Sequence, residues 1–437
     1  MTPRERLFSL EQFGIKLGLE NIHKILDALD RPERAWPAVH IAGTNGKGSV
    51  TAMVEYGLRA AGHRTGRYTS PHLDRIEERI AIDGVPVAPD LFDTVAADLL
   101  ALVDRLLESG TLEATPTFFE VTTAMAFEIF RRAEVTVGVI EVGLGGRFDA
   151  TNVLTPEVTA ITSIAFDHER HLGNTLAKIA FEKAGVIKPG VPVVVGELPS
   201  EAYGVVTAEA RERHAPLLPA GGEHIEAPFF DRGRVTVVMR TPSGRYPPIR
   251  LGLNGAHQLA NAIVAARTLE VCGDRGLQTG PGEVITALAE ADWPARLEWL
   301  RTPAGRYVLL DAAHNPAGAE AFAQYAQAAG VARLPIVIAV MKDKNIIAML
   351  DALAPVASLF ITADVGTERS MKARALTTAI VGAHPSIPVV TGGTPEEAID
   401  TALMLANRIA ITGSIFMVGP ARARLIADGA VHVDEAK

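Results

Sequence analysis

The segment Gly43-Thr-Asn-Gly-Lys-Gly-Ser49 decides the fold of the first part of the chain, because it joins an apolar run to a helical one. The run before it, Val39-His-Ile-Ala42, is typical of a buried strand, and the residues from about Lys47 to Ala61 predict a helix that ends at Gly62. A strand, a glycine-rich turn and a helix in this order are typical of a parallel α/β layer.

The same segment predicts a phosphate site. A helix that begins at the carboxyl end of a strand presents backbone N–H groups and a positive dipole end, and glycines let the backbone approach a ligand closely. The spacing departs from a strict Walker A motif, since Ile41 stands where the first glycine belongs and Gly48 separates Lys47 from Ser49. A glycine-rich turn with a surface lysine is the alternative, but the strand, glycines, lysine and hydroxyl together favour phosphate.

The α/β alternation continues along the chain and restarts after a break near Asp292. We expect an α/β protein with a large P-loop-type ATPase domain over residues 1–292, built on a parallel sheet with a small antiparallel patch. A smaller Rossmann-like α/β domain is expected over residues 293–437. Strands are predicted at Val135–Ile140, Val158–Thr162, Tyr307–Leu310, Pro335–Ala339, Ser358–Ile361 and Ser414–Met417, helices at Gln258–Cys272 and just before Trp293, and the antiparallel patch between about Val191 and Leu253.

Composition excludes several classes of protein. The 437 residues are 48% hydrophobic and 21% charged, which excludes wholesale disorder, and the net charge of −9 argues against a general nucleic-acid partner. The single cysteine, Cys272, excludes an internal disulfide and a thiolate metal cluster. No apolar run approaches the roughly 18 residues needed to span a bilayer. We expect a cytoplasmic monomer without membrane or nucleic-acid partners.

Glu141 and His168 are candidate ligands for a metal ion. Glu141 ends an apolar run, as a Walker-B-type acid would, although an acid at a strand end can also be a solvated loop residue. His168 and His171 are three residues apart, but without a cysteine partner or a His-Glu-x-x-His spacing zinc is not expected.

Lys183 lies inside the apolar arc of a predicted helix, between the positions of Ile179 and Leu176. A buried ammonium is costly unless it is paired or chemically altered. The alternative is that the long side chain extends along the apolar surface and reaches water.

Several segments together resemble the folylpolyglutamate synthases and dihydrofolate synthases of the Mur ligase superfamily. They follow in that family's order and cover both expected domains. These segments are Gly43–Ser49, Thr69-Ser-Pro-His-Leu73 with Glu78-Arg-Ile80, the stretch from Glu141 to Asn152, Asp167-His168, the stretch from Glu182 to Pro189, and Asp311-Ala-Ala-His-Asn-Pro316.

The resemblance implies a site for ATP, with two Mg²⁺ ions and a lysine carboxylated by CO₂. Local structural roles are the alternatives: a rim salt bridge for Arg296, a buried helix amide for Asn261, a helix cap for Asp311 and core packing for Phe118 and Phe119. The implied ATP contacts are Thr44, Asn45, Gly46, Lys47, Gly48, Ser49, Asn261, Arg296, Asp311 and His314. The implied metal ligands are Ser70, Glu141, His168 and carboxylated Lys183. The implied pterin contacts are Thr117, Phe118, Phe119, Glu120, Phe148, Asp149 and Ala150.

The implied activity is an ATP-dependent amide ligase that adds L-glutamate to dihydropteroate, to the γ-carboxylate of reduced folates, or to both, through an acyl phosphate. The residues implied in catalysis are Lys47, Glu141, His168, Lys183 and Arg296. A monofunctional folylpolyglutamate synthase is one alternative. A Mur-type peptidoglycan ligase would need a further N-terminal domain before Gly43, and a non-catalytic nucleotide-binding module would lose the metal-site residues. Lys342-Asp-Lys344 is interpreted as a solvated charged turn.

Overall fold

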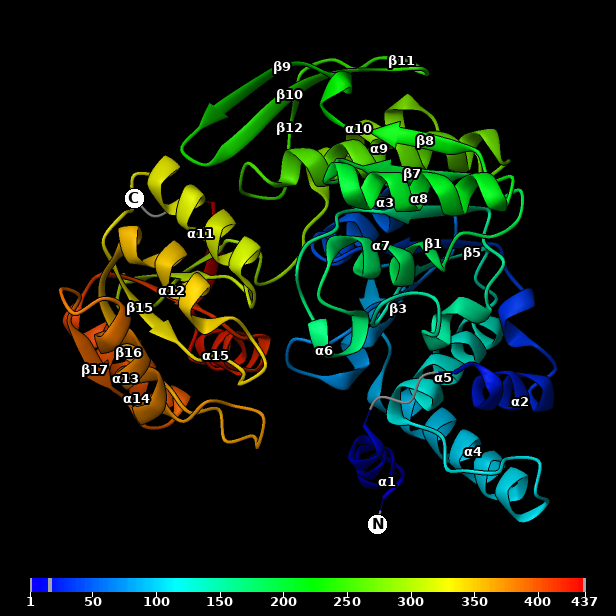
Figure 1. The fold of residues 1–437 in the computed structure, drawn as a ribbon, viewed down its shortest axis with the longest axis horizontal. Helices are drawn as coiled ribbons and strands as arrows, with labels where there is room; N and C mark the ends of the chain where they lie inside the picture. Colours follow the sequence, from blue (N-terminus) through cyan, green and yellow to red (C-terminus); the bar gives the residue numbers. More distant parts are fainter. Residues whose placement is uncertain (1, 15–17, 435–437) are drawn as a thin grey trace. The chain divides into compact units, whose positions relative to one another are not determined.

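The computed structural model describes residues 2–14 and 18–434. The chain forms two compact units, which are described separately (Figure 1). Unit 1 runs to Ile225 and also contains Met239–Tyr246 and Ala260–Ala291, while unit 2 contains Glu226–Val238, Pro247–Leu259 and everything from Asp292 onward.

Unit 1 is built on an eight-stranded sheet that is parallel except at one edge. Its central strands are short, β-branched and buried on both faces, as expected for a parallel sheet covered by helices. The strands, in their order across the sheet, are β4 (Val85–Pro86), β3 (Ile80–Ile82), β2 (Thr65–Tyr68), β5 (Val137–Glu141), β1 (Ala38–Ala42), β6 (Val158–Ile161), β7 (Val193–Gly196) and β8 (Leu217–Ala220), of which β3 and β4 are antiparallel to their neighbours.

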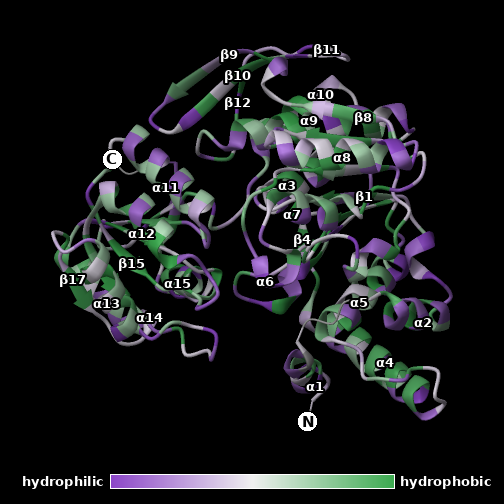
Figure 2. Ribbon diagram, viewed as in Figure 1, coloured by the Kyte–Doolittle hydropathy of each residue, from purple (hydrophilic) through white to green (hydrophobic). Residues whose placement is uncertain are grey.

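Helices surround this sheet, some packed on its strands and others packed on those helices (Figure 2). They are α1 (Pro3–Ser9), α2 (Glu20–Ala28), α3 (Lys47–Ala60), α4 (Pro89–Glu108), α5 (Phe118–Arg132), α6 (Glu169–Leu172), α7 (Leu176–Ala184), α8 (Ser200–Glu212), α9 (Gln258–Asp274) and α10 (Pro281–Glu290). One hydrophobic core lies under α2, α4 and α5, and another lies between β6, β7, α7 and α8.

The antiparallel patch is smaller than the sequence predicts. The prediction of an antiparallel patch from Val191 is wrong, because β7, α8 and β8 form one more parallel strand–helix–strand unit. The antiparallel sheet begins only at Ile225. Its strands are β9 (Ile225–Asp231), β10 (Arg234–Thr241), β11 (Gly244–Arg245) and β12 (Ile249–Arg250).

Unit 2 contains a seven-stranded sheet with its own core. Its strands in order are β17 (Val389–Thr391), β16 (Ala357–Thr362), β15 (Leu334–Ile338), β18 (Arg408–Thr412), β14 (Tyr307–Leu310), β13 (Glu298–Arg301) and β19 (Val431–Val433), and its helices are α11 (Pro316–Ala328), α12 (Ile346–Leu353), α13 (Ala373–Ala383), α14 (Pro395–Leu405) and α15 (Ile415–Ala427). Strands β17 to β14 are parallel, and β13 is antiparallel to both of its neighbours.

The predicted strand Ser414–Met417 is wrong. The strand is β18, and Gly413, with a φ of 99°, ends the extended chain just after it. Ser414 then caps α15, because its side chain accepts a hydrogen bond from the amide of Phe416 at 3.2 Å. The apolar run that suggested a strand is therefore the first turn of a helix, in which Met417 is buried and Phe416 is exposed.

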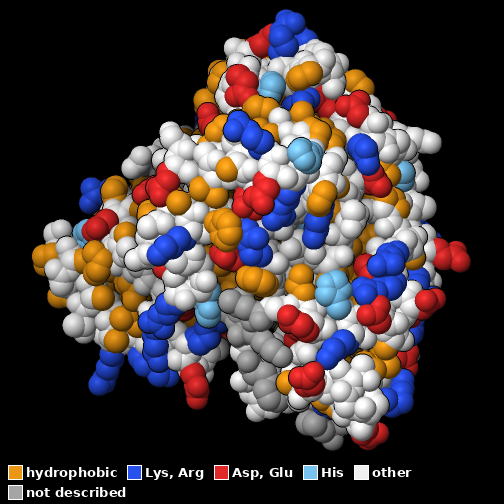
Figure 3. Space-filling view, turned by 45° about the vertical axis from the view of Figure 1, so that its right-hand side comes forward, with side chains coloured by type: hydrophobic (Ala, Val, Ile, Leu, Met, Phe, Trp, Pro, Cys, Tyr) orange, Lys and Arg blue, Asp and Glu red, His pale blue; other side chains and the backbone are white. Residues whose placement is uncertain are grey.

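The surface is of mixed charge on the face that Figure 3 shows, where Lys and Arg side chains lie among Asp and Glu side chains. Among the described helices, none is long and apolar enough to cross a membrane.

Candidate active site

The glycine loop, residues Gly43–Ser49, is held in shape by the strand beside it. Because β1 and β6 are neighbours in the sheet, the residues that follow β6 lie next to the loop. Thr162 Oγ1 donates to the carbonyl oxygen of Asn45 at 2.6 Å, and Ser163 Oγ accepts from the Asn45 amide at 3.0 Å. The Thr44 amide donates to the Ser163 carbonyl at 2.8 Å. The loop is therefore shaped by contacts within the protein itself.

The first turn of α3 has the geometry of an anion site. Gly46 is its N-cap residue, with a φ of 84°, and provides no side chain to cap the N–H groups of that turn. Such N–H groups, together with the helix dipole, attract phosphate. Lys47 Nζ donates to the carbonyl oxygens of Gly43 and Thr44, at 3.2 Å each, so its ammonium lies over the loop.

Asn261, from α9, lies against the same loop. A Cβ on Gly46 would come within 2.2 Å of Asn261 Oδ1, so only glycine fits beside this side chain. Ser49 is buried and Gly48 is partly buried in the first turn of α3. The structure thus brings the predicted nucleotide contacts of unit 1 to one place.

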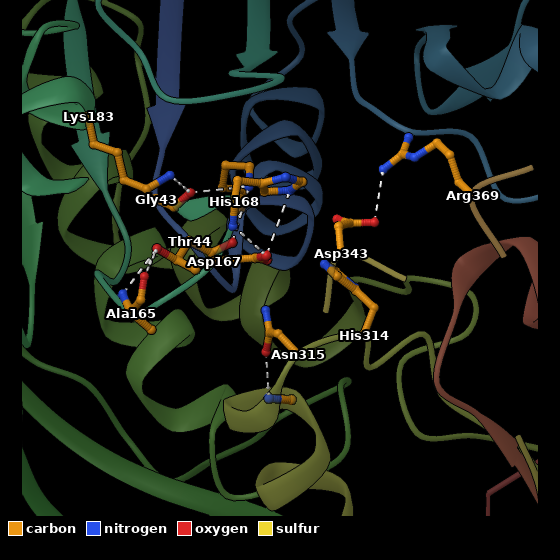
Figure 4. Close-up of polar contacts among 12 residues, drawn as sticks. Gly43, Thr44, Ala165, Asp167, His168, Lys183, His314, Asn315, Asp343 and Arg369 are labelled. Carbon is orange, nitrogen blue, oxygen red and sulfur yellow. Dashed lines mark hydrogen bonds and ion pairs between the residues drawn. The ribbon is translucent and has the colours of Figure 1, made fainter. Parts of the chain in front are cut away.

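Lys183 is buried against the glycine loop. Its side chain leaves α7 and Nζ donates to the carbonyl oxygen of Gly43 at 2.8 Å (Figure 4). The residue is 4% exposed, so the side chain does not extend to water. Burial, together with the charge of Lys47, lowers the pKa of Lys183 to about 7, although Asp167 and Asp149 act in the opposite direction. Both causes favour the neutral, nucleophilic form of this amine over the ammonium.

Glu141 and Ser70 meet at the same edge of the sheet. Glu141 is the last residue of β5 and is paired in register with Ile41, just before the glycine loop. Its carboxylate is 5% exposed and accepts a hydrogen bond from the Ser70 amide at 3.3 Å. A carboxylate at the end of the neighbouring strand is the arrangement expected of a Walker-B-type acid.

The pair Asp167-His168 follows β6 on the other side of the loop. Asp167 Oδ1 accepts from the His168 amide at 2.8 Å and lies 3.9 Å from His168 Nε2 (Figure 4). The sequence interpretation gave Asp167 no role, yet its charge acts on Lys183. Its position could have identified it, because Asp167 is an acid that follows β6 at the same edge of the sheet as the glycine loop.

The donor chemistry at this edge suits a hard divalent cation better than zinc. A carboxylate (Glu141) and a hydroxyl (Ser70) offer oxygen ligands, and His168 offers one nitrogen. Within residues 2–14 and 18–434, no group of three or more His, Cys, Asp and Glu side chains is arranged to hold a metal ion. The set therefore fits Mg²⁺ in kind but would need further oxygen donors.

The polar residues predicted for the pterin pocket have local roles. Thr117 and Glu120 form the capping box of α5. Glu120 Oε2 accepts hydrogen bonds from the Thr117 amide at 2.7 Å and from the Thr117 hydroxyl at 2.9 Å. Asp149 accepts from the amides of Leu144 at 2.8 Å and Thr151 at 3.0 Å, and burial raises its pKa.

The apolar residues of that prediction divide into two groups. Phe118 belongs to the core and stacks on Phe8 with ring centroids 5.9 Å apart. The Phe119 ring lies so close to Gly143 that a Cβ there would be 2.4 Å from it, which packs the two predicted segments together. Phe148, in contrast, is 43% exposed, and Ala150 beside it is buried.

In unit 2, the arginine turn, residues Ala295–Leu297, carries Arg296. Arg296 Nη1 donates to the Ala295 carbonyl at 3.2 Å. Asp311 lies beside the turn, and its carboxylate accepts from the amides of Leu297 and Ala313, at 2.9 Å each. Burial raises the pKa of Asp311, while the charge of Arg296 lowers it. His314 is partly buried, three residues further along the chain.

Two alternatives from the sequence are answered by contacts in unit 2. The cap of α11 is Asn315, which accepts from the Gly318 amide at 2.9 Å, so Asp311 does not cap that helix. In the charged turn that begins at Lys342, Asp343 pairs with Arg369 at 3.6 Å (Figure 4). That contact is typical of a solvated charged turn.

Comparison with known proteins places this geometry in a family. Residues 295–415 match the model described as Mur ligase, glutamate ligase domain. The dihydrofolate synthase/folylpolyglutamate synthase of Mycobacterium tuberculosis is 36% identical over 436 residues, covering 92% of this chain and 89% of that protein. The protein of the same name from Bacillus subtilis is 33% identical over 427 residues, covering 95% and 96%.

Solved structures of the same family are similar to this chain in fold. The folylpolyglutamate synthase of Mycobacterium tuberculosis complexed with ADP and AMPPCP has a TM-score of 0.88 at 34% identity and covers 99% of this chain and 100% of that chain. Escherichia coli FolC in complex with DHPP and ADP has a TM-score of 0.84 at 28% identity, covering 98% of each chain.

Fold and site therefore define a ligase of the Mur type. Within that class, the chain belongs to the dihydrofolate synthase/folylpolyglutamate synthase family, which confirms the resemblance carried by its motifs.

Proposed function

We propose that this protein adds L-glutamate to dihydropteroate and to the γ-carboxylate of reduced folates, using ATP. The observation that carries the proposal is the burial of Lys183 against Gly43, which joins the lysine of one motif to the phosphate loop of another. The ADP, AMPPCP and folate named for structural relatives support a nucleotide and a folate as ligands.

In unit 1, we assign the triphosphate to the first turn of α3. Lys47 would exchange its contacts with the loop carbonyls for phosphate oxygens, and the amides of the first turn, Lys47 to Ser49, would bind the same groups. Thr44 and Asn45, whose amides donate to Ser163, would line the site. Asn261 would act on the adenine side. We propose residues 1–292 as the ATP-binding domain.

Mg²⁺ would be held by Glu141, Ser70, His168 and a carboxylated Lys183. The neutral amine of Lys183 would attack the carbon of CO₂ and lose one proton, giving a carbamate that supplies the missing oxygen donors. When bound, the cation would neutralise charge on the phosphates.

In unit 2, we propose residues 293–437 as the ligase domain. Arg296 would bind phosphate oxygens, with Asp311 and His314 beside the nucleotide. Phe148 would offer its exposed ring to the pterin, next to the segments 117–120 and 149–150.

The chemistry these residues permit is phosphoryl transfer followed by acyl transfer. An oxygen of the substrate carboxylate attacks the γ-phosphorus, and ADP leaves, which gives an acyl phosphate. The neutral amine of L-glutamate then attacks the acyl carbon, phosphate leaves, and the nitrogen loses a proton as the amide forms. The side chains contribute charge neutralisation and alignment, so no protein nucleophile is required.

The test is phosphate release from ATP in the presence of L-glutamate, with dihydropteroate and tetrahydrofolate supplied separately. We expect release with both acceptors and a product longer by one glutamate in each case by mass spectrometry. Release with tetrahydrofolate alone would identify a monofunctional folylpolyglutamate synthase, and no release above background with either would remove the proposal.

We further propose that the protein works as a monomer in the cytoplasm on small-molecule substrates. Sedimentation equilibrium should return the mass of one chain, 46.4 kDa.

A further inference from the structure

The backbone on both sides of Arg296 is in an unusual conformation. Ala295 and Leu297 have φ values of 57° and 50°, in the left-handed region that residues with a Cβ rarely adopt. Both side chains are fully buried, whereas Arg296 between them is only partly buried. The turn therefore buries its two neighbours and projects the arginine. Such a backbone persists only where the surroundings hold it, and positions of this kind concentrate at functional sites.

One side of this arginine turn is held by Glu298. Its Oε2 accepts from the Ala295 amide at 2.8 Å. The Ala295 carbonyl in turn accepts from the Ala312 amide at 3.0 Å. On the other side, Asp311 accepts from the Leu297 amide at 2.9 Å. Each residue that flanks Arg296 is thus fixed by its own buried carboxylate.

Glu298 is itself held by charged side chains from distant parts of unit 2. Arg422, on α15, donates through Nε to both carboxylate oxygens, at 3.1 and 2.8 Å, and His432, on β19, lies 3.6 Å away. Burial opposes ionisation, but the contacts with His432, Arg422 and the Ala295 amide outweigh it and lower the pKa of Glu298 to about 2. A fully ionised carboxylate, 5% exposed, is therefore fixed in front of the turn.

We propose that Glu298 is a positioning residue for Arg296, and that Arg422 acts through Glu298. The inference rests on the proposed function, in which Arg296 binds phosphate oxygens of the nucleotide. Because phosphoryl transfer depends on alignment, a guanidinium on a backbone that could relax would bind the transferring group less well. Glu298 touches neither substrate nor nucleotide in this account; it fixes the backbone from which Arg296 extends.

The test is a double-mutant cycle on the full-length enzyme, with kcat and KM for ATP measured for Glu298→Gln, Arg296→Ala and the double variant. We expect Glu298→Gln to lower kcat/KM for ATP by about tenfold in the wild-type background. In the Arg296→Ala background, the same substitution should change it by less than twofold, because the arginine it positions is gone. A merely structural role would reduce the rate by the same factor in both backgrounds, and that result would overturn the proposal.

Arg422→Met provides a second, independent variant should Glu298→Gln fail to fold. It leaves Glu298 in place and should show the same dependence on Arg296, with a smaller effect. ATP affinity measured by titration calorimetry supplies a readout besides turnover, and should weaken in both single variants. Glu397→Gln is the matched control, because Glu397 also accepts from a backbone amide, that of Thr394 at 3.0 Å, at the start of α14.

The outcomes separate this inference from the proposed function. A wild-type enzyme inactive with both acceptors removes the proposed function, and the inference with it. An active wild type with an unimpaired Arg296→Ala variant overturns the inference alone. An impaired Arg296→Ala variant with unchanged kcat/KM in Glu298→Gln and Arg422→Met does the same.

Discussion

In the proposed function, the glycine loop of unit 1 and the arginine turn of unit 2 each place a cation for a phosphate group, but the two are built in opposite ways. In the glycine loop, the residues with positive φ are glycines, Gly43 at 147° and Gly46 at 84°. In the arginine turn, they are Ala295 and Leu297. Glycine adopts such angles without strain, whereas residues with a Cβ do so only under constraint.

The source of the constraint differs accordingly. The glycine loop is held largely by hydroxyls and backbone groups of the neighbouring strand, such as Thr162 and Ser163. The arginine turn is held by Glu298 and Asp311, and Glu298 depends on Arg422 from a distant helix. The glycine loop is therefore visible in the sequence as a motif, although the hydroxyls that hold it come from 117 and 118 residues away. The arginine turn carries no such glycine signal, and the charge that fixes Glu298 comes from another helix.

The largest effect is expected where the glycine loop carries its own cation. Lys47→Ala removes the ammonium over the loop and should lower turnover by on the order of a hundredfold or more, because positive charge is lost where charge develops on the transferring phosphate. Phosphate release under saturating ATP measures the effect, and the thermal transition should stay near that of the wild type. Wild-type turnover in this variant would show that the loop does not bind the triphosphate.

The next effect concerns the lysine buried beneath the loop. Lys183→Ala should lower turnover by at least tenfold, because it removes the proposed carbamate. A short carboxylic acid such as acetate should restore part of the rate by occupying the space left behind. The matched control is Lys178→Ala on the exposed side of the same helix, where acetate should have no effect. A carbon-13 signal from labelled bicarbonate, present in the wild type and lost in Lys183→Ala, is the direct check.

The sequence predicts the glycine loop well and the arginine turn poorly. The strand, turn and helix around Gly43–Ser49 are local, and their period and glycine spacing suffice to place them. Arg296 was recognised only through the motif around it, and nothing in the sequence links it to Arg422, more than a hundred residues later. Contacts of that kind arise from strand order, which local patterns do not encode.

The same distinction explains the errors in the fold. The strand predicted at Ser414–Met417 was judged by its apolar run, although short runs fit a buried helix face equally well. The stretch after Val191 was interpreted from its glycines and prolines, yet the parallel unit there continues to Ala220. In the site, the sequence pattern places Lys183 on the apolar face of its helix. Its contact with Gly43 could not be predicted, because the two residues meet only in the folded chain.

Acid should weaken the arginine turn before it affects the glycine loop's backbone contacts. The pKa of Glu298 is lowered from 4.5 to about 2 in the folded protein, so the unfolded chain takes up this proton first as the pH falls. The stabilisation that depends on ionisation of Glu298 itself is complete above about pH 5 and is lost between about pH 4.5 and 2. The free energy of unfolding of the wild type, relative to Glu298→Gln, should therefore shrink by about 1 kcal/mol per pH unit below pH 4. Because Glu298 also raises the pKa of His432, part of the difference should be lost again as the pH rises above about 6.5 and His432 loses its proton. Urea titrations at fixed pH measure this difference; a difference that stays flat to pH 3.5 would contradict the depressed pKa.

The smallest effect is expected where glycine is introduced rather than removed. Ala295→Gly relieves the strain of a φ of 57° but loses one buried methyl group and adds freedom to the unfolded chain, so its free energy of unfolding should change by less than about 1 kcal/mol. The reverse exchange in the glycine loop, Gly46→Ala, should cost more than about 2 kcal/mol, because its Cβ would come within 2.2 Å of Asn261 Oδ1 at a φ of 84°. Urea midpoints of the two variants, measured side by side, test the comparison directly. Equal losses in the free energy of unfolding would contradict the comparison. They would mean that the arginine turn needs the methyl group of Ala295 as strictly as the glycine loop needs its absence at Gly46.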